Sequence, residues 1–374
     1  MAIDKRGRKL PKGIRQRSDT FEGRFTYQGK SYTVHGKTIT ETQKNMTDLK
    51  YKLEHGVYVS KKQITLNDWF ETWMEEYKKN RIKRGTYENY KKNFYGIIKR
   101  RFNLGNIQLT DIRGEHIQKL YNDLVKEGYA LSTIKIVSAV LNGCMQQALR
   151  NGLIERNPVK LAELPRQTEK ATRQAMTREQ QALFMEYAKE SYLYNFYAVM
   201  LRTGMRNGEM RGLKYTDIDK KKNVIRVQRT LKYIEGEGYY EDTPKTRTSK
   251  RDIPLTAATL QLLEEQRKFW GFKVEKMDRY LFCNELGEPL SRARVRAETD
   301  RIVKRIRAAG HDFPHITPHV FRHTFATRAI EAGMQPQVLK TILGHSSLAM
   351  TMDLYSHVLP ETRAEEMEKI ANVF

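Results

Sequence analysis

Cysteine is almost absent from this sequence, since only Cys144 and Cys283 occur in 374 residues. Neither has a second cysteine at the short spacing of zinc sites, which excludes a disulfide-built scaffold and a cysteine-based metal centre. Long apolar runs are also lacking. A stretch such as LYNFYAVML is far below the roughly 18 residues of a membrane span, and the start MAIDKRGRKLPKG has no apolar core for export. These absences predict a soluble protein of a reducing cytoplasm, with no membrane partner.

Acidic residues are in the minority. The chain has 68 Lys and Arg against 44 Asp and Glu, which gives a formal net charge of +24 and an isoelectric point near 9.8. An excess of this size favours a polyanionic partner, with nucleic acid ahead of an acidic membrane surface. A merely solvated basic surface is the plainer alternative. Because the basic residues are spread along the whole length, they do not form one disordered tail.

The pattern of residues divides the chain into three segments. Residues 1–60 contain short alternating runs such as GRFTYQGKSYTVHGKTI, and then one helix that closes at Gly56. Residues 1–58 carry 13 Lys or Arg against 6 Asp or Glu, which predicts a small basic sheet-plus-helix module that binds DNA, or more simply a cap. Residues 61–165 turn wholly helical at TLNDWFETWMEEYKK, where apolar side chains recur at helical spacing.

The third segment, residues 166–374, follows a polar stretch that contains prolines and predicts a linker. Thr177 and Gln180 form a capping-box pattern that predicts the start of a new helical unit. NVIRVQRTL and KRDIPL read as strands, and the end, PETRAEEMEKIANVF, reads as a short amphipathic tail helix. The predicted fold class is therefore a multidomain protein, mainly α with small β-sheets.

Four histidines at every fourth position, in HDFPHITPHVFRHTFATRAIEAG, raise the question of a metal site. Pro314 and Pro318 interrupt the interval, and the residue before a proline is pushed out of the helical region. We expect a helix that begins with Thr317 as its N-cap and Pro318 at its first position. His311, His315 and His319 then do not share one helix, so the sequence predicts no metal ligand set.

Four further motifs carry chemistry: TGMRNGEMRGLKYTDID, TPKTRTSKRDIPL, HVFR and LGHSSLAMTMDLYSH. In order and approximate spacing, they resemble the signature boxes of tyrosine recombinases, the integrase class. The resemblance is specific over residues 175–360 and looser over the helical segment. Over residues 1–58 it extends to a sheet-plus-helix layout that is similar to the arm-binding modules of integrases from phages and conjugative transposons.

Carried over by position, the resemblance implies these catalytic residues: Arg206, Lys245, His319, Arg322, His345 and Tyr355. Glu209 matches the acid that steadies the first arginine, and Lys250 is the weaker candidate for the lysine. Purely structural roles remain as alternatives for three of these residues. Arg206 could form a surface ion pair with Glu209, Tyr355 could be a packing residue, and His345 could only end a helix.

The chemistry of DNA cleavage needs these residue types. An unperturbed tyrosine is only about 0.1% phenolate at neutral pH, so its attack on phosphorus needs assistance. Two guanidiniums can hold the non-bridging oxygens of a phosphodiester, and loss of one such preorganised donor typically costs about 10²- to 10³-fold in rate. A lysine can protonate the departing 5′ oxygen. No metal is required, because the two guanidiniums neutralise the charge that develops on the phosphate. No ATP is required, because the phosphotyrosine bond conserves the energy of the broken bond, and no other cofactor is expected.

The resemblance also implies partners and assembly. These are double-stranded DNA at core and arm-type sites, a homotetramer on two DNA sites, a Holliday junction, and accessory DNA-bending or excision factors. The alternatives are a type IB topoisomerase-like relaxing enzyme, a catalytically silent DNA-binding regulator and a metal-dependent nuclease. Persistence of cleavage in EDTA would exclude the nuclease.

Overall fold

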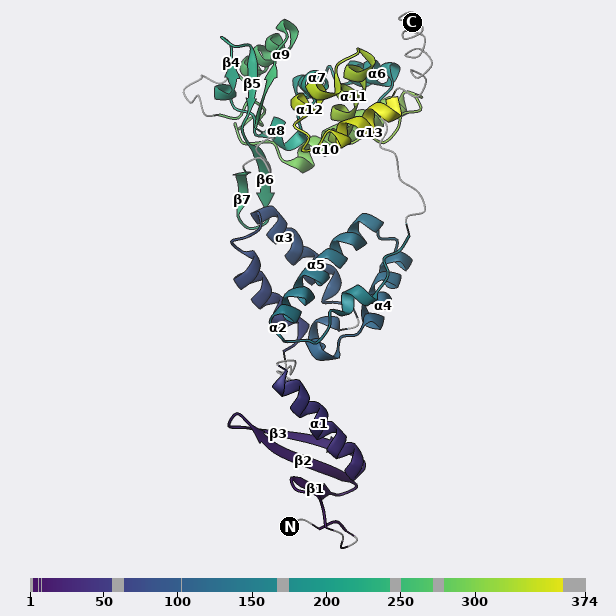
Figure 1. Ribbon diagram of the computed structural model, residues 1–374. Helices are drawn as coiled ribbons and strands as arrows, with labels where there is room; N and C mark the ends of the chain where they lie inside the picture. The colour runs from purple at the N-terminus through teal and green to yellow at the C-terminus, as the bar shows by residue number, and fades with distance from the viewer. Residues whose placement is uncertain are drawn as a thin grey trace, which may run out of the picture. The chain divides into compact units, whose positions relative to one another are not determined.

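The computed structural model describes residues 3–5, 7, 9–55, 64–101, 103–166, 175–242, 250–271 and 279–358 (Figure 1). The chain forms two compact units, Met1–Glu169 and Lys170–Phe374. Both are mostly helical with small antiparallel sheets, so the predicted fold class is confirmed. No helix within the described ranges is both long and apolar enough to cross a membrane. Gly56, Lys245 and the predicted tail helix lie outside the described residues.

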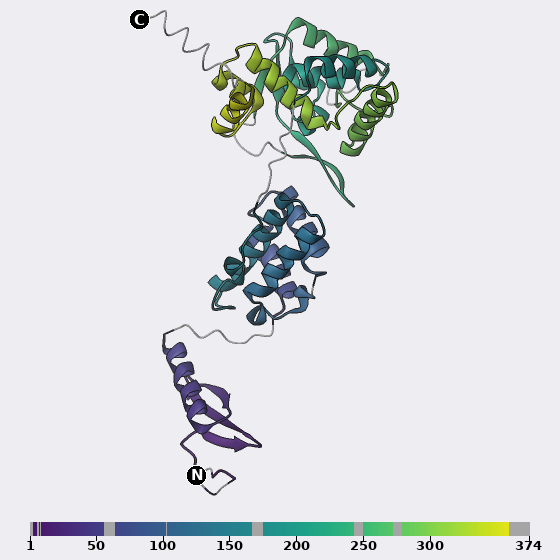
Figure 2. The same ribbon diagram turned by 90° about the vertical axis from the view of Figure 1, so that its right-hand side faces the viewer.

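The N-terminal part of the first unit is a three-stranded antiparallel sheet with one helix, as the alternating pattern predicts. Helix α1 lies along one face of the sheet in both ribbon views (Figures 1 and 2). A Cβ at Gly23 would lie 2.5 Å from Met46 Sδ, so the glycine allows this close packing. The elements are β1 (Ile14–Arg17), β2 (Thr20–Tyr27), β3 (Lys30–Gly36) and α1 (Ile39–Glu54).

The rest of the first unit is helical around an aromatic core. Thr65 caps its first helix by accepting a hydrogen bond from the Asp68 backbone N–H at 3.2 Å, and Trp73 and Phe94 are fully buried, as their helical spacing predicts. Its α-helices are α2 (Leu66–Thr72), α3 (Arg84–Asn93), α4 (Gly114–Lys126) and α5 (Leu131–Arg150). Short π-helical segments, Trp73–Lys78 and Phe94–Ile98, continue α2 and α3.

The second unit surrounds two small sheets with helices. Strands β4 (Ile218–Asp219), β5 (Val224–Val227) and β8 (Arg251–Pro254) pair in that order. The hairpin of β6 (Thr230–Ile234) and β7 (Gly238–Asp242) projects from the unit (Figure 2). The helices are α6 (Arg178–Tyr187), α7 (Tyr194–Thr203), α8 (Asn207–Arg211), α9 (Ala257–Lys268), α10 (Arg292–Ala308), α11 (Pro318–Glu331), α12 (Pro336–Leu343) and α13 (Ala349–Val358).

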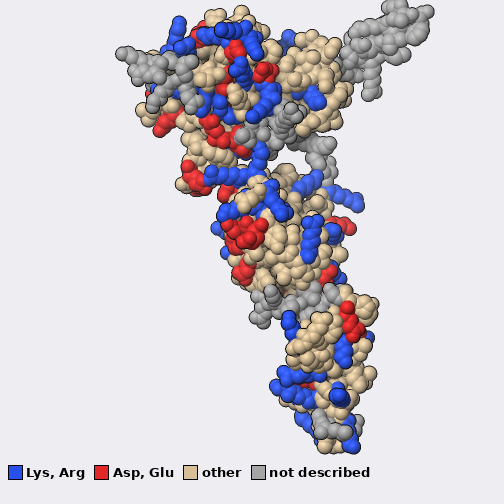
Figure 3. All heavy atoms as spheres, turned by 60° about the vertical axis from the view of Figure 1, so that its left-hand side comes forward, with Lys and Arg blue, Asp and Glu red and all other residues tan. Residues whose placement is uncertain are grey.

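Two helix starts in this unit confirm their local signals. Thr177 and Gln180 make the reciprocal capping box at the start of α6, and α11 begins at Pro318 after Thr317. The central helices α7, α10 and α11 bury one shared apolar core that includes Phe196, Ile302 and Phe321. Figure 3 shows Lys and Arg side chains distributed over both units on the face in view, in keeping with the net charge.

Candidate active site

A cavity of about 180 Å³ lies in the second unit, where residues of α11, the C-terminal end of α12 and helix α13 meet Arg206. Four residues that the sequence predicts for catalysis line it, although they come from segments far apart in the chain. The lining residues are Arg206, His319, Arg322, His323, Ala326, Leu343, His345, Met350 and Leu354. A shared catalytic role requires that these residues meet in space, and in this cavity they do.

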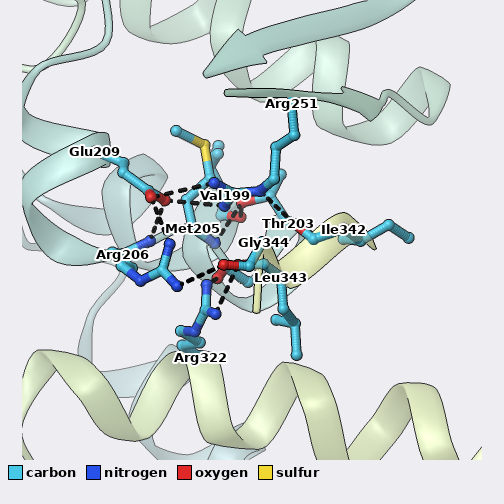
Figure 4. A network of polar contacts seen from close by, with 11 residues as sticks. Val199, Thr203, Met205, Arg206, Glu209, Arg251, Arg322, Ile342, Leu343 and Gly344 are labelled. Atoms are coloured by element: carbon cyan, nitrogen blue, oxygen red, sulfur yellow. Dashed lines mark hydrogen bonds and ion pairs between the residues drawn. The ribbon is translucent and has the colours of Figure 1, made fainter. Parts of the chain in front are cut away.

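The C-terminal end of α12 organises the cations of the site. Gly344 closes this helix in the left-handed conformation (φ 63°). Carbonyls at a helix end lack helical partners and carry the negative end of the helix dipole, so they suit cationic donors. Three successive carbonyls accept hydrogen bonds from three arginines: Ile342 from Arg251, Leu343 from Arg322 at 2.7 Å and Gly344 from Arg206 at 3.0 Å (Figure 4).

Arg206 is held at the start of α8 by a carboxylate. Its Nη1 donates to Glu209 Oε1 at 2.8 Å, and its backbone N–H donates to Glu209 Oε2 at 2.9 Å. The Arg206 side chain keeps 36% of its surface exposed, whereas Glu209 keeps only 2%. The pair is therefore no solvated surface ion pair: a buried carboxylate fixes a guanidinium whose surface partly faces the cavity.

Arg322 lies on α11 and is buried. Its Nη1 donates to the Gly204 carbonyl at 2.8 Å and its Nη2 to the Leu343 carbonyl at 2.7 Å. These neutral acceptors satisfy its hydrogen bonds but do not cancel its charge. Burial first, and then the neighbouring guanidinium of Arg206, lower the pKa of Arg322 to about 9, so it stays protonated at neutral pH.

The histidines of the site differ in their surroundings. His345 is buried, and its Nδ1 lies 3.0 Å from Thr351 Oγ1. Burial, and then the positive charges of Arg322, Arg206 and Arg251, lower the pKa of His345 to about 4. Its imidazole is therefore neutral at pH 7. His319, in contrast, is exposed at the start of α11, and its ring lies edge-on to that of His323, 4.7 Å between centroids.

Tyr355 lies on α13, but its hydroxyl does not face the two cavity arginines. It donates a hydrogen bond to the carbonyl of Met334, which follows the C-terminal end of α11. Arg322 lies nine residues before the end of that helix at Glu331, a rise of roughly 13.5 Å at about 1.5 Å per residue, and Met334 follows that end. Burial raises the pKa of Tyr355, which is opposite to what a nucleophile needs. The adjacent residue of α13, Leu354, lines the cavity.

The predicted lysine, Lys245, lies outside the described residues, so its position is not assigned. Lys250, the weaker candidate, is exposed and lines a second cavity of about 790 Å³ beside the first. His345 lines both cavities. This second cavity is also lined by Arg226, Arg251 and Lys340, so its walls are rich in cations.

The arrangement suits an anion. Three guanidiniums meet here, and among the described residues Arg206 and Arg251 pair with the one carboxylate of Glu209, whereas Arg322 binds neutral carbonyls. Positive charge therefore exceeds negative charge at this largely buried place. Unneutralised buried charge is unfavourable, so an arriving phosphodiester would be stabilised there. Within the described residues, no group of three or more His, Cys, Asp or Glu side chains is placed to hold a metal ion.

Sequence reasoning missed Arg251. Its guanidinium makes two hydrogen bonds to Glu209, of 2.9 and 3.1 Å, from the first residue of β8. A signal was available in the strand RDIP, because Arg251 and Ile253 share one face and Ile253 is buried. A charged residue in the buried register of a strand indicates an internal ion pair.

Comparisons with known proteins identify the family of this chain. The profile of the phage integrase family matches residues 174–362, and that of the phage integrase N-terminal SAM-like domain matches residues 65–125. A XerC-like tyrosine recombinase of Caldanaerobacter subterraneus subsp. tengcongensis is 27% identical and aligns over 91% of each chain. The transposase from transposon Tn916 of Enterococcus faecalis is 26% identical over 98% of this chain and 96% of its own.

A solved structure extends the agreement to the fold. The Tn1549 transposon integrase in complex with transposon right end DNA is 25% identical, covers 82% of this chain and 100% of that structure, and gives a TM-score of 0.71. The family match spans half of the chain, and the sequence relatives match over nearly their whole lengths. The chain therefore belongs to the phage integrase family and is a tyrosine recombinase, an enzyme that breaks and rejoins DNA.

Proposed function

We propose that this chain is the integrase of a mobile genetic element, which cuts double-stranded DNA at specific sites through Tyr355 and rejoins it to a second site. The observation that carries the proposal is the pair Arg206 and Arg322, held by successive carbonyls at the end of α12 in one cavity. The alignment with the Tn916 transposase over 98% of this chain supports a mobile element as the source, because it includes the N-terminal module.

The two arginines bind the scissile phosphate. Their guanidiniums donate to its non-bridging oxygens and stabilise the charge that develops in the transition state, where the buried surroundings strengthen the effect. Glu209 keeps Arg206 oriented without entering the cavity, since its carboxylate is almost fully buried. Arg206 therefore keeps the orientation in which its guanidinium donates to the scissile phosphate.

Tyr355 is the nucleophile once α13 brings its hydroxyl from the Met334 carbonyl to the phosphate. Its oxygen forms a bond to phosphorus while the bond to the 5′ oxygen breaks, which leaves a 3′-phosphotyrosine. The neutral imidazole of His345, with His319 at the cavity rim, can accept the phenol proton. The cationic surroundings favour the phenolate, so the raised pKa of the resting tyrosine falls on entry.

A lysine protonates the departing 5′ oxygen. Lys245 fills this role by its place in the motif, with Lys250, beside the second cavity, as the alternative. Because the phosphotyrosine bond keeps the energy of the broken diester, attack by another 5′ hydroxyl reseals DNA without ATP. No metal or other cofactor takes part.

Each protomer supplies one tyrosine, and full exchange between two duplexes needs four strand cleavages, so four protomers act on two sites through a Holliday junction. The helical and catalytic parts bind core sites and the basic N-terminal module binds arm-type sites. Accessory DNA-bending or excision factors set the direction. An enzyme with this substrate works in the bacterial cytoplasm, associated with DNA.

Covalent capture tests the proposal. The protein is incubated with fragmented host and element DNA in EDTA and then denatured, and the attached DNA is sequenced while the modified peptide is mapped. We expect adducts at Tyr355, and none from Tyr355→Phe, because phenylalanine has no nucleophilic oxygen. Tyr194→Phe is the matched control, since Tyr194 is also partly buried in this unit, and it should still form the adduct.

The alternatives give different results. Non-covalent binding without any adduct, even on nicked DNA, would contradict the assignment of Tyr355 as the nucleophile and would favour a DNA-binding regulator. Adducts together with relaxation of supercoiled DNA, but without joining of two sites, would favour a topoisomerase-like enzyme.

A further inference from the structure

Arg251 is a buried cation that joins two parts of the catalytic site. It is the first residue of β8, and its side chain keeps only 2% of its surface exposed. Towards α8, its Nη1 and Nη2 donate to the two oxygens of Glu209 at 3.1 and 2.9 Å. Towards α12, its Nε donates to the carbonyl of Ile342. One planar guanidinium therefore contacts both structures that hold Arg206.

The first contact sets the state of the carboxylate beneath Arg206. Burial by itself would raise the pKa of Glu209, but the hydrogen bonds and charge of Arg251, and then the charge of Arg206, lower it below its ordinary value. Without Arg251, Arg206 is the cation that stays paired with the buried Glu209 among the described residues. We expect that guanidinium to turn further toward the carboxylate and away from the cavity, because a buried charge must be compensated.

The second contact sets the position of the helix end. Ile342 is followed directly by Leu343 and Gly344, whose carbonyls hold Arg322 and Arg206, and then by His345 (Figure 4). A shift at Ile342 is therefore transmitted along three peptide units to every one of these contacts. Lysine cannot replace the planar guanidinium of Arg251, because a single ammonium cannot hold two carboxylate oxygens and a carbonyl in the same plane.

We infer that Arg251 is a positioning residue for DNA cleavage: it fixes Arg206 through Glu209 and fixes the α12 end through Ile342, without touching the phosphate itself. This inference rests on the proposed function. A purely structural Arg251 would support folding only, and its loss would affect all substrates alike. If Arg251 instead positions Arg206 and the α12 end, the loss of cleavage rate on its replacement depends on the negative charge of the scissile phosphate.

The test compares Arg251→Met and Arg251→Lys with the wild-type full chain. The substrates are nicked duplexes that carry the element end recovered by covalent capture, with either a phosphodiester or an uncharged methylphosphonate at the scissile position. Single-turnover cleavage, DNA affinity and thermal unfolding are measured for each. Arg211→Met is the matched control, because Arg211 is a buried arginine of α8 that binds the carbonyls of Leu290 and Leu231 instead.

On the phosphodiester, we expect Arg251→Met to cleave about 10- to 100-fold more slowly than wild type, since small displacements of a catalytic group have effects of this size. On the methylphosphonate, the defect should shrink to within about threefold, because less charge needs stabilisation. Arg251→Lys should be intermediate, and it carries the test if the methionine variant does not fold. Arg211→Met should show equal effects on the two substrates. Equal defects for the Arg251 variants, or none, would overturn the inference.

A second measurement needs no reaction. In NMR spectra of the free protein, we expect the guanidinium protons of Arg206 to exchange with water more slowly in Arg251→Lys than in wild type, because the guanidinium turns from the cavity toward the buried carboxylate of Glu209, with no change at Arg211. Unchanged exchange at Arg206 would refute the positioning role whatever the rates. If the wild-type protein forms no adduct on any DNA, both the proposed function and the positioning role of Arg251 are refuted. If only the Arg251 pattern is wrong, the proposed function stands.

Discussion

At the scale of single residues, the neutral state of His345 links stability to pH. Its pKa is about 4 in the folded protein and near 6.5 in an unfolded chain. Between these values, the unfolded state binds more protons, so the free energy of unfolding falls as the pH is lowered. From about pH 7.5 to about pH 5, we expect this group to contribute a loss of about 2 kcal/mol, measured by urea unfolding.

His345→Asn is the control for that loss. Asparagine keeps a hydrogen-bonding side chain but takes up no proton, so the variant should lack this share of the pH dependence, although it is less stable at every pH. The titration of Glu209 does not affect this comparison. Its pKa is lowered, so the stability it contributes is lost only below about pH 4.5, its ordinary value. Equal pH dependence in both proteins would contradict the assignment of a neutral buried imidazole.

At the scale of an element, the end of α7 requires glycine for two reasons. Gly204 has φ 61°, and a Cβ there would lie 2.4 Å from Phe325 Cδ1 and 2.9 Å from Leu343 Cδ2. Its carbonyl also accepts a hydrogen bond from Arg322. Gly204→Ala should therefore destabilise the fold by about 2–4 kcal/mol, the left-handed strain plus overpacking. It should also slow cleavage, because Leu343 must move.

Gly310→Ala separates the contribution of backbone strain from that of overpacking. Gly310 also has positive φ, 89°, but a Cβ there meets no atom within 4 Å, so only the backbone strain remains. Thermal unfolding and single-turnover cleavage of the two variants give the comparison. If Gly204→Ala cost no more than Gly310→Ala, close packing at the end of α7 would not contribute to the site.

At the scale of the whole molecule, the net charge of +24 predicts salt-sensitive DNA binding. If six or more phosphates are contacted, affinity for duplex DNA should fall by at least about 1,000-fold between about 50 and about 200 mM salt. A triple change to glutamine in the N-terminal module, at the exposed Arg24, Lys30 and Lys37, should reduce the slope of log affinity against log salt by up to about three.

Titrations of arm-site DNA at several salt concentrations provide the measurement. The proposed role of the N-terminal module predicts that the triple variant loses affinity for arm-site DNA and keeps its affinity for core-site DNA. An unchanged slope for both kinds of DNA would show that these residues do not contact phosphate, and would leave the module as a simple cap.

Features that depend on near neighbours in the chain were predictable from the sequence. The capping box of Thr177 and the start of α11 at Pro318 are set by contacts within a few residues. The strands around Ile225 and Ile253 follow the alternation of buried and less buried residues along the chain. The order of the motifs indicated the family, and with it the residues that meet in the cavity. The catalytic roles assigned to them, and the domain limits at residues 60 and 165, stay predictions.

Only the tertiary structure decided how those residues are arranged. The three carbonyls at the end of α12 meet arginines that lie 21, 91 and 138 residues away along the chain. The ion pair that links Arg251 to Glu209 spans 42 residues. The resting position of Tyr355 on the Met334 carbonyl is likewise a packing outcome. Spacing along a chain determines turns and helix faces, whereas burial and charge at one point depend on every segment folded around it.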